Sequence, residues 1–134
     1  MDLEIAKKII KAAIKQALEI NVLCSVAVVD NKGFLVALYR MDDALIPTAD
    51  LARDKAWTAA AFKMPSKDIG RFGDPSRPDA GFSRQNWNDR LTTIPGGLPV
   101  MDGSKVTGGV GISGGTPEED VLICEAAISS IHTG

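Results

Sequence analysis

The spacing of apolar residues divides the first part of the chain into one helical and two extended segments. Residues 2–20 carry apolar side chains every three or four positions, with lysines on the opposite side, which predicts an amphipathic helix. Residues 22–30 are almost continuously apolar and β-branched, which favours a strand buried on both faces. The segment Asp30–Gly33 has the composition of a tight turn, and residues 34–40 follow as a second strand. The pattern therefore predicts a β-hairpin after the first helix.

The second part of the chain repeats this alternation with more alanine, glycine and proline. An alanine-rich helix is predicted to begin at Pro47 or Thr48. Residues 67–93 hold prolines, glycines and aromatic residues, a composition typical of an ordered loop with a functional or interface role. Two more strands are predicted, one across 97–100 and a longer one across 106–113.

The last helix is predicted from its capping residues. Thr116 suits the N-cap, Pro117 the first helical position and Glu119 the third, which together form a capping box. The order is then helix-strand-strand-helix-loop-strand-strand-helix. Hairpins imply antiparallel pairing, so the sequence predicts an α+β fold in which helices pack on an antiparallel sheet, within a single domain of residues 1–134.

Composition and charge narrow the classes of function. Apolar residues make up 45% and charged residues 24% of the 134 residues, as in ordinary globular proteins. The net charge of -2, without a basic stripe, argues against nucleic acid and against an acidic membrane surface as partners. The two cysteines lie in apolar runs and no metal-ligand spacing is present, so buried thiols and no metal site are expected. The N-terminus lacks the pattern of a signal peptide, which favours a cytoplasmic location.

Residues 109–114 match the G-x-G-x-x-G pattern of dinucleotide-binding loops. Such a fold also needs a second parallel strand with an acidic residue about 20 positions on, and only one helix follows the glycines here. Glu118, Glu119 and Asp120 already place carboxylates where a phosphate would bind. We therefore expect no nucleotide cofactor. The glycines are expected to let a helix, a second copy of the chain or a ligand approach the strand backbone closely.

Four separated motifs together resemble a known family. They are VAVVDNKGFLVALYRMDDA (26–44), ARDKAWTAAAF (52–62), IPGGLPV (94–100) and VTGGVGISGGTPEED (106–120). In this order they resemble the GlcG/HbpS-like family, which carries the label haem-degrading domain and includes the C-terminal domain of PduO-type corrinoid adenosyltransferases. The resemblance implies a profilin-like α+β fold and self-association as homodimers or larger homo-oligomers. It also implies haem, a small planar ligand, as a cofactor.

The resemblance further implies a ligand-binding site made of residues within its motifs. Arg40, Met41 and Asp42 end the second predicted strand, either at a pocket rim or in a strand-end ion pair. Lys55 and its helical neighbours offer one face to a planar ring, unless they only pack the helix on the sheet. The full set of implied site residues is Arg40, Met41, Asp42, Lys55, Thr58, Phe62, Gly96, Gly97, Gly109 and Gly111.

Protein ligands for haem iron are few in this sequence. Histidine, methionine, cysteine and tyrosine are the usual ligands. The single histidine, His132, lies near the chain end and is expected to be solvated, while Met41 and Tyr39 remain open as ligands. Haem would then be held mainly by shape, by stacking and by propionate pairing to Arg40, Lys55 or an arginine of the 67–93 loop.

A catalytic function is the alternative. Asp42, Asp43, Asp54 and Lys55 lie near one strand end, where they would form either an acid–base cluster or a surface salt bridge. No catalytic residue can be assigned from this pattern. Two functions therefore stay open. One is a haem-binding protein for haem capture, sensing or degradation, and the other is a small-molecule enzyme or accessory in hydroxy acid or diol utilisation, with its pocket at a subunit interface.

Overall fold

The computed structural model describes residues 1–73, 76 and 88–132, with side chains for all of these except 71–73. Its elements are α1 (Leu3–Glu19), β1 (Ser25–Asp30), β2 (Leu35–Arg40), α2 (Thr48–Phe62), the 3-10 helix η1 (Ser66–Gly73), β3 (Gly97–Asp102), β4 (Lys105–Ser113) and α3 (Pro117–Ser129). The predicted order of helices and strands is confirmed, as is the α+β class. Residues 74, 75 and 77–87 of the predicted loop lie outside the described residues.

The four strands form one antiparallel sheet in the order β2-β1-β4-β3. The sheet consists of two hairpins that join along their inner strands β1 and β4. In the hairpin of β3 and β4, Val100 pairs with Gly108 but Met101 pairs with Val106, so Thr107 is an extra residue. Such a bulge increases the local twist of a hairpin and changes the direction of its side chains.

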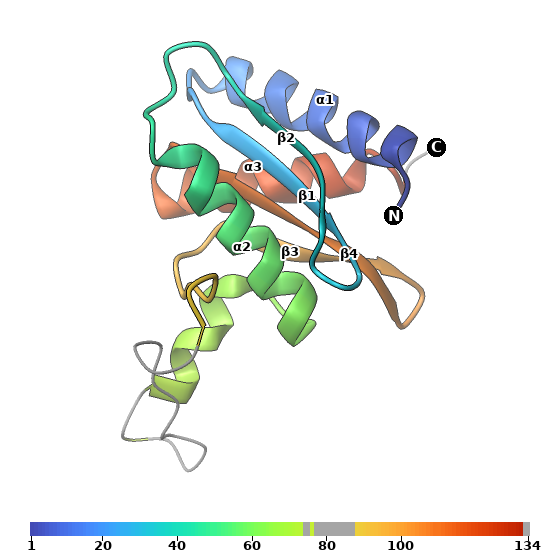
Figure 1. Cartoon of the computed structure of the whole chain (residues 1–134). Helices are drawn as coiled ribbons and strands as arrows, with labels where there is room; N and C mark the ends of the chain where they lie inside the picture. Colours follow the sequence, from blue (N-terminus) through green and yellow to red (C-terminus); the bar gives the residue numbers. More distant parts are fainter. Residues whose placement is uncertain (74–75, 77–87, 133–134) are drawn as a thin grey trace.

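Helices cover both faces of the sheet, with α2 on one face and α1 and α3 on the other (Figure 1). Alternate residues of β1 serve the two faces, because successive side chains of a strand point in opposite directions. Val26 and Val28 belong to the apolar core with α1 and α3, whereas Ala27 and Val29 pack with alanines of α2. No helix in the described part of the chain combines the length and apolar character needed to cross a membrane.

The α2 helix lies directly on the backbone of β3 and β4. A Cβ atom on Gly97, Gly109 or Gly111 would overlap the carbonyl oxygen of Lys55, Ala56 or Ala52, respectively. The glycines of the G-x-G-x-x-G window therefore allow close approach of a helix, one of the three alternatives that the sequence left open. The predicted capping box at the start of α3 is confirmed, with the Glu119 N–H donating to Thr116 Oγ1 and the Thr116 N–H donating to Glu119 Oε1.

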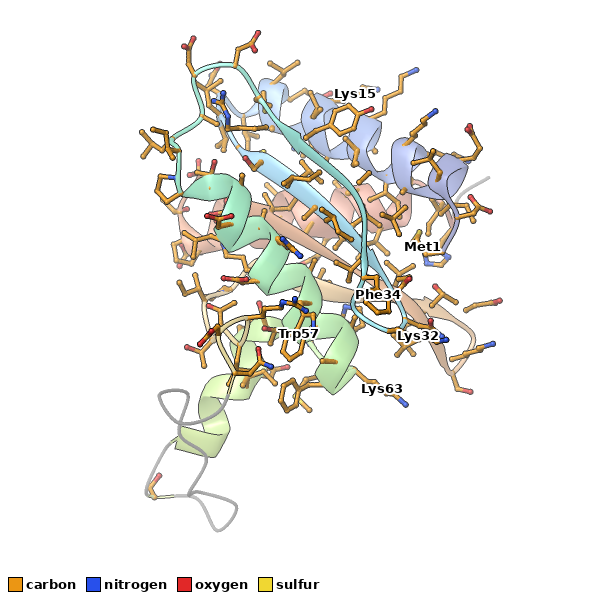
Figure 2. All side chains as sticks on the ribbon, viewed as in Figure 1. Met1, Lys15, Lys32, Phe34, Trp57 and Lys63 are labelled. Atoms are coloured by element: carbon orange, nitrogen blue, oxygen red, sulfur yellow. The ribbon has the colours of Figure 1, made fainter. Side chains whose placement is uncertain are left out.

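At the far end of α2, the Trp57 side chain points toward the turn between β1 and β2, where Lys32 and Phe34 lie (Figure 2). Gly33 in this turn has a φ of 85°, and a side chain there would meet the Trp57 ring. The predicted glycine turn is confirmed, and the indole holds it against α2.

Candidate functional site

The predicted rim residues Arg40, Met41 and Asp42 lie at the end of β2 and just after it. Arg40 is exposed, and its Nη1 donates to the carbonyl oxygen of Ala44 at 3.0 Å. Met41 covers Cys24, whose backbone N–H donates to Met41 Sδ at 3.4 Å. Asp42 is exposed. Arg40 thus contacts Ala44 and Met41 contacts Cys24, so neither of these two side chains is bonded to Lys55.

Lys55 is a buried cation that links α2 to β4 and α3. Its side chain is 1% exposed, and Nζ donates to the Ile112 carbonyl oxygen at 2.7 Å and to Asp120 Oδ2 at 3.1 Å. The other carboxylate oxygen of Asp120 accepts the Gly115 N–H at 2.8 Å. Lys55 therefore pairs with a residue of α3, and not with Asp42 or Asp54 as the predicted acid–base cluster required.

The electrostatics of this pair are set by burial. Burial raises the pKa of Asp120 above its ordinary value, and the Lys55 ammonium and the N–H groups of Gly115 and Gly114 offset part of that rise. A general acid or base must contact its substrate. With exposed fractions of 1% and 3%, Lys55 and Asp120 lie inside the protein, so the geometry supports a structural link between elements.

Thr58, which the resemblance placed in a ring-binding patch, holds the segment that precedes β3. Its Oγ1 donates to the Arg90 carbonyl oxygen at 3.2 Å and accepts the Thr92 N–H at 3.0 Å. Phe62, the last residue of α2, is half-buried.

The four predicted site glycines lie in the same region. Gly96 is buried beside the Lys55 ammonium, and Gly97, Gly109 and Gly111 are covered by the α2 backbone. The structure therefore brings Lys55 and the glycines together in a packed interface. Their role in ligand binding stays a prediction.

The opposite face of the sheet has an open cavity of about 340 Å³. We call it the chain-end groove, and define it by Ile5 and Lys8 of α1, Val100 and Met101 of β3, and Ile131 and His132 after α3. Figure 1 shows the start of α1 and the end of α3 side by side next to the β3–β4 hairpin. Figure 2 shows Met1, another lining residue, at that end of α1.

The groove is lined by apolar side chains and by side chains that can bind iron. Ile5, Val100 and Ile131 supply apolar walls. Met1 and Met101 bring thioethers and His132 brings an imidazole, and both groups are usual ligands of haem iron. The bulge after Val100 falls within the groove. Sequence reasoning missed this site because its parts are distant along the chain. The available signal was that the single histidine follows the last amphipathic helix closely.

The structure is thus a small α+β protein in which α2 packs closely on one face of the sheet, while the other face carries a groove lined by apolar side chains, thioethers and an imidazole. The family model described as haem degrading protein, HbpS-like, matches residues 1–129. This chain belongs to the HbpS-like family of haem-degrading proteins.

Individual relatives agree with this assignment. An uncharacterised 15.0 kDa protein of the dhaT-dhaS intergenic region of Citrobacter freundii is 39% identical over 92% of this chain and 86% of its own length. The corrinoid adenosyltransferase PduO of Salmonella typhimurium is 33% identical over 92% of this chain, which spans only 37% of PduO. The solved structure of a PduOC:heme complex has a TM-score of 0.91 and 30% identity, covering 100% of this chain and 96% of that one.

Proposed function

We propose that this chain binds haem in the chain-end groove and serves haem capture, sensing or degradation. The observation that carries the proposal is the likeness to PduOC, a protein of 30% identity whose solved structure is a haem complex. The family match over residues 1–129 supports the same ligand. Fold alone would not assign a function, so the groove must also suit the ligand.

The residues of the groove fit the demands of haem. A macrocycle needs apolar walls, which Ile5, Val100 and Ile131 provide, and its iron needs a protein ligand such as His132 or Met101. Lys8 offers a cation to a propionate. Bound haem would supply the iron chemistry, while these side chains would bind the ring, exclude water from it and fix its orientation.

A haemin titration followed by visible absorption tests the proposal. We expect the Soret band to shift and to saturate near one equivalent of haemin per chain. A featureless spectrum that does not saturate would contradict haem binding altogether.

Two matched surface variants locate the site. Ile5→Glu replaces an apolar wall of the groove with a carboxylate three residues before Lys8, and we expect it to weaken haemin binding roughly tenfold, because it puts a polar group against the macrocycle and competes with a propionate for the Lys8 ammonium. Leu18→Glu makes the same change at a 61% exposed side chain near the other end of α1, and it should leave haemin affinity unchanged. Equal affinities for the two variants would move the site away from the groove.

We also propose that the chain self-associates through the exposed apolar side chains near the loop before α2. Leu23, Leu45 and Ile46 are 47%, 72% and 89% exposed. Leu23 and Leu45 line the same shallow pocket and Ile46 follows Leu45 in the chain, and exposed apolar side chains that lie together are typical of protein contacts. Sedimentation velocity would measure the assembly. Ile46→Asp should shift it toward monomers, while Leu18→Asp, at a 61% exposed position of α1, should not.

We further propose that the protein works in the reducing setting of the cytoplasm, and the two free buried thiols support this proposal.

A second candidate is an accessory role in diol or hydroxy acid utilisation, with the pocket at a subunit interface. The match to PduO supports it, although this chain corresponds to just over a third of that protein. Thermal unfolding with a panel of small diols and hydroxy acids tests it. Stabilisation by one of them, together with an absence of saturable haemin binding, would favour this function over the first.

A further inference from the structure

We propose that His132 supplies the axial nitrogen ligand to the iron of a haem held in the chain-end groove, an inference that rests on the proposed haem-binding function. The histidine is not part of a free tail, because hydrogen bonds extend the turn beyond α3. The Ile131 N–H donates to the Ile128 carbonyl oxygen at 3.2 Å, and the His132 N–H donates to that of Ser129 at 3.1 Å. These bonds hold the backbone of His132 at the groove, which the exposed side chain of this residue lines.

Three sulfur atoms outside the groove, those of Cys24, Cys124 and Met41, are closed off or already in contact with another group. Cys24 and Cys124 are fully buried. Burial raises the pKa of Cys24 to about 12, which keeps its thiol protonated, whereas iron binds the thiolate. The Met41 sulfur accepts the Cys24 N–H. His132 is the single imidazole of the whole sequence.

Charged groups at the groove mouth give the haem an orientation. Lys8 on α1 and Asp102 at the end of β3 both line the groove, so one wall is cationic and the other is anionic. Propionates favour the Lys8 wall and avoid Asp102. We therefore place the propionate edge of the ring toward α1, and the iron toward the turn that carries His132.

A second cavity offers the competing ligand. It has a volume of about 300 Å³ and is lined by Lys7, Lys11 and Tyr39, so a phenolate could ligate iron there while two ammonium groups pair with propionates. The chain-end groove is favoured because it combines a nitrogen ligand with a thioether neighbour, Met101. The two cavities predict different spectra and different sensitive variants.

The test compares haemin binding by the wild-type chain and five variants through Soret absorption and electron paramagnetic resonance. The variants are His132→Ala, Met101→Leu, Tyr39→Phe, Lys8→Met and Asp102→Asn. His132→Ala should lose roughly tenfold or more in haemin affinity, about 1.4 kcal/mol per tenfold, and should lose the spectrum of nitrogen ligation. Met101→Leu and Tyr39→Phe should keep the wild-type spectrum. Lys8→Met should weaken binding about two- to fivefold, and Asp102→Asn should not weaken it.

Two further measurements separate loss of the iron ligand from loss of the fold. Metal-free protoporphyrin IX should bind wild type and His132→Ala equally, since no iron–nitrogen bond is involved. Added imidazole should restore the wild-type spectrum to haemin-loaded His132→Gly. If the wild type saturates with haemin but His132→Ala keeps its spectrum and affinity, or if Tyr39→Phe alone loses them, His132 is not the ligand and the haem function stands. If the wild type does not saturate, the proposed function itself fails.

Discussion

The two faces of the sheet pack against helices in opposite ways. On the α2 face, Gly109 and Gly111 have no side chains, and the backbone of α2 lies directly on the backbone of β4. On the other face, Val110 and Ile112 of the same strand meet the branched side chains of α1 and α3. A face built from backbone contact leaves no room for a ligand, because protein interiors are close-packed. The face that carries α1 and α3, here called the side-chain face, is packed through side chains. It leaves an open space beyond the last of them, and Ile131 lines that space as part of the groove.

The closed face also holds a charge, and its removal is the largest effect that we predict. Lys55→Met leaves the Asp120 carboxylate buried without its partner, which costs about 3–5 kcal/mol of the free energy of unfolding. Lys11→Met, at an exposed position of α1, is the matched control and should cost little. Urea unfolding followed by circular dichroism measures both.

A double variant sharpens this prediction. In Lys55→Met/Asp120→Leu no charge is left unpaired, so it should be more stable than Lys55→Met alone, because apolar replacement of a whole buried pair is often tolerated. If Lys55→Met were as stable as Lys11→Met, the link between α2 and α3 would contribute nothing to the fold, and the description of the closed face would need revision.

The next effect comes from adding one methyl group to the closed face. Gly111→Ala forces its Cβ onto the Ala52 carbonyl oxygen, so α2 must move, and we expect a loss of about 3 kcal/mol. Gly70→Ala is the control, because its Cβ would lie 4.0 Å from Thr93 Cβ, an ordinary contact. Denaturant midpoints at constant m-value compare the two variants. Equal midpoints would show that α2 does not press on β4 in solution.

The fold could be predicted from local patterns in the sequence. The buried ion pair and the groove could not, because each is formed by residues that are far apart along the chain. Periodicity predicted the helices and hairpins, and residues 116–119 predicted the capping box, because each signal lies within a few residues. The pairing of Lys55 with Asp120 spans 65 positions, and the sequence pattern placed Asp120 only among the carboxylates at the start of the last helix. His132 was expected to be solvated, and its side chain is exposed. The groove that it lines could not be predicted, since that groove forms only when α1 and the turn after α3 meet the β3–β4 hairpin.

The side-chain face makes stability sensitive to alkaline pH. Burial, with a smaller effect of Asp120, raises the pKa of Cys24 from 9.0 to about 12, and burial also raises the pKa of Cys124. Below pH 9 the thiols are protonated in both states. Above it, the unfolded chain releases protons that the folded chain keeps, so stability falls as pH rises, by about 1.4 kcal/mol per thiol at pH 10.

The Cys24→Ala variant isolates one of these thiols. The variant should lose roughly half of the fall in unfolding free energy between pH 8 and pH 10, whatever its stability at pH 8, because only Cys124 then releases a proton on unfolding. Urea titrations at the two pH values measure the difference. A fall as steep as that of the wild type would mean that Cys24 is accessible to solvent in the folded state.

The smallest predicted effect is a small loss of stability when one buried side chain of the side-chain face is shortened. Ile9 of α1 is fully buried in the core, and Ile9→Val removes one methylene without leaving a large cavity, which costs about 1 kcal/mol. Ile9 does not line the groove, so haemin affinity should not change. The two faces would then differ in their tolerance of substitution, since removing a methylene from the side-chain face costs less stability than adding a methyl group to the α2 face. A loss for Ile9→Val greater than that for Gly111→Ala, measured under the same conditions, would reverse this comparison, because the side-chain face would then be the less tolerant of the two.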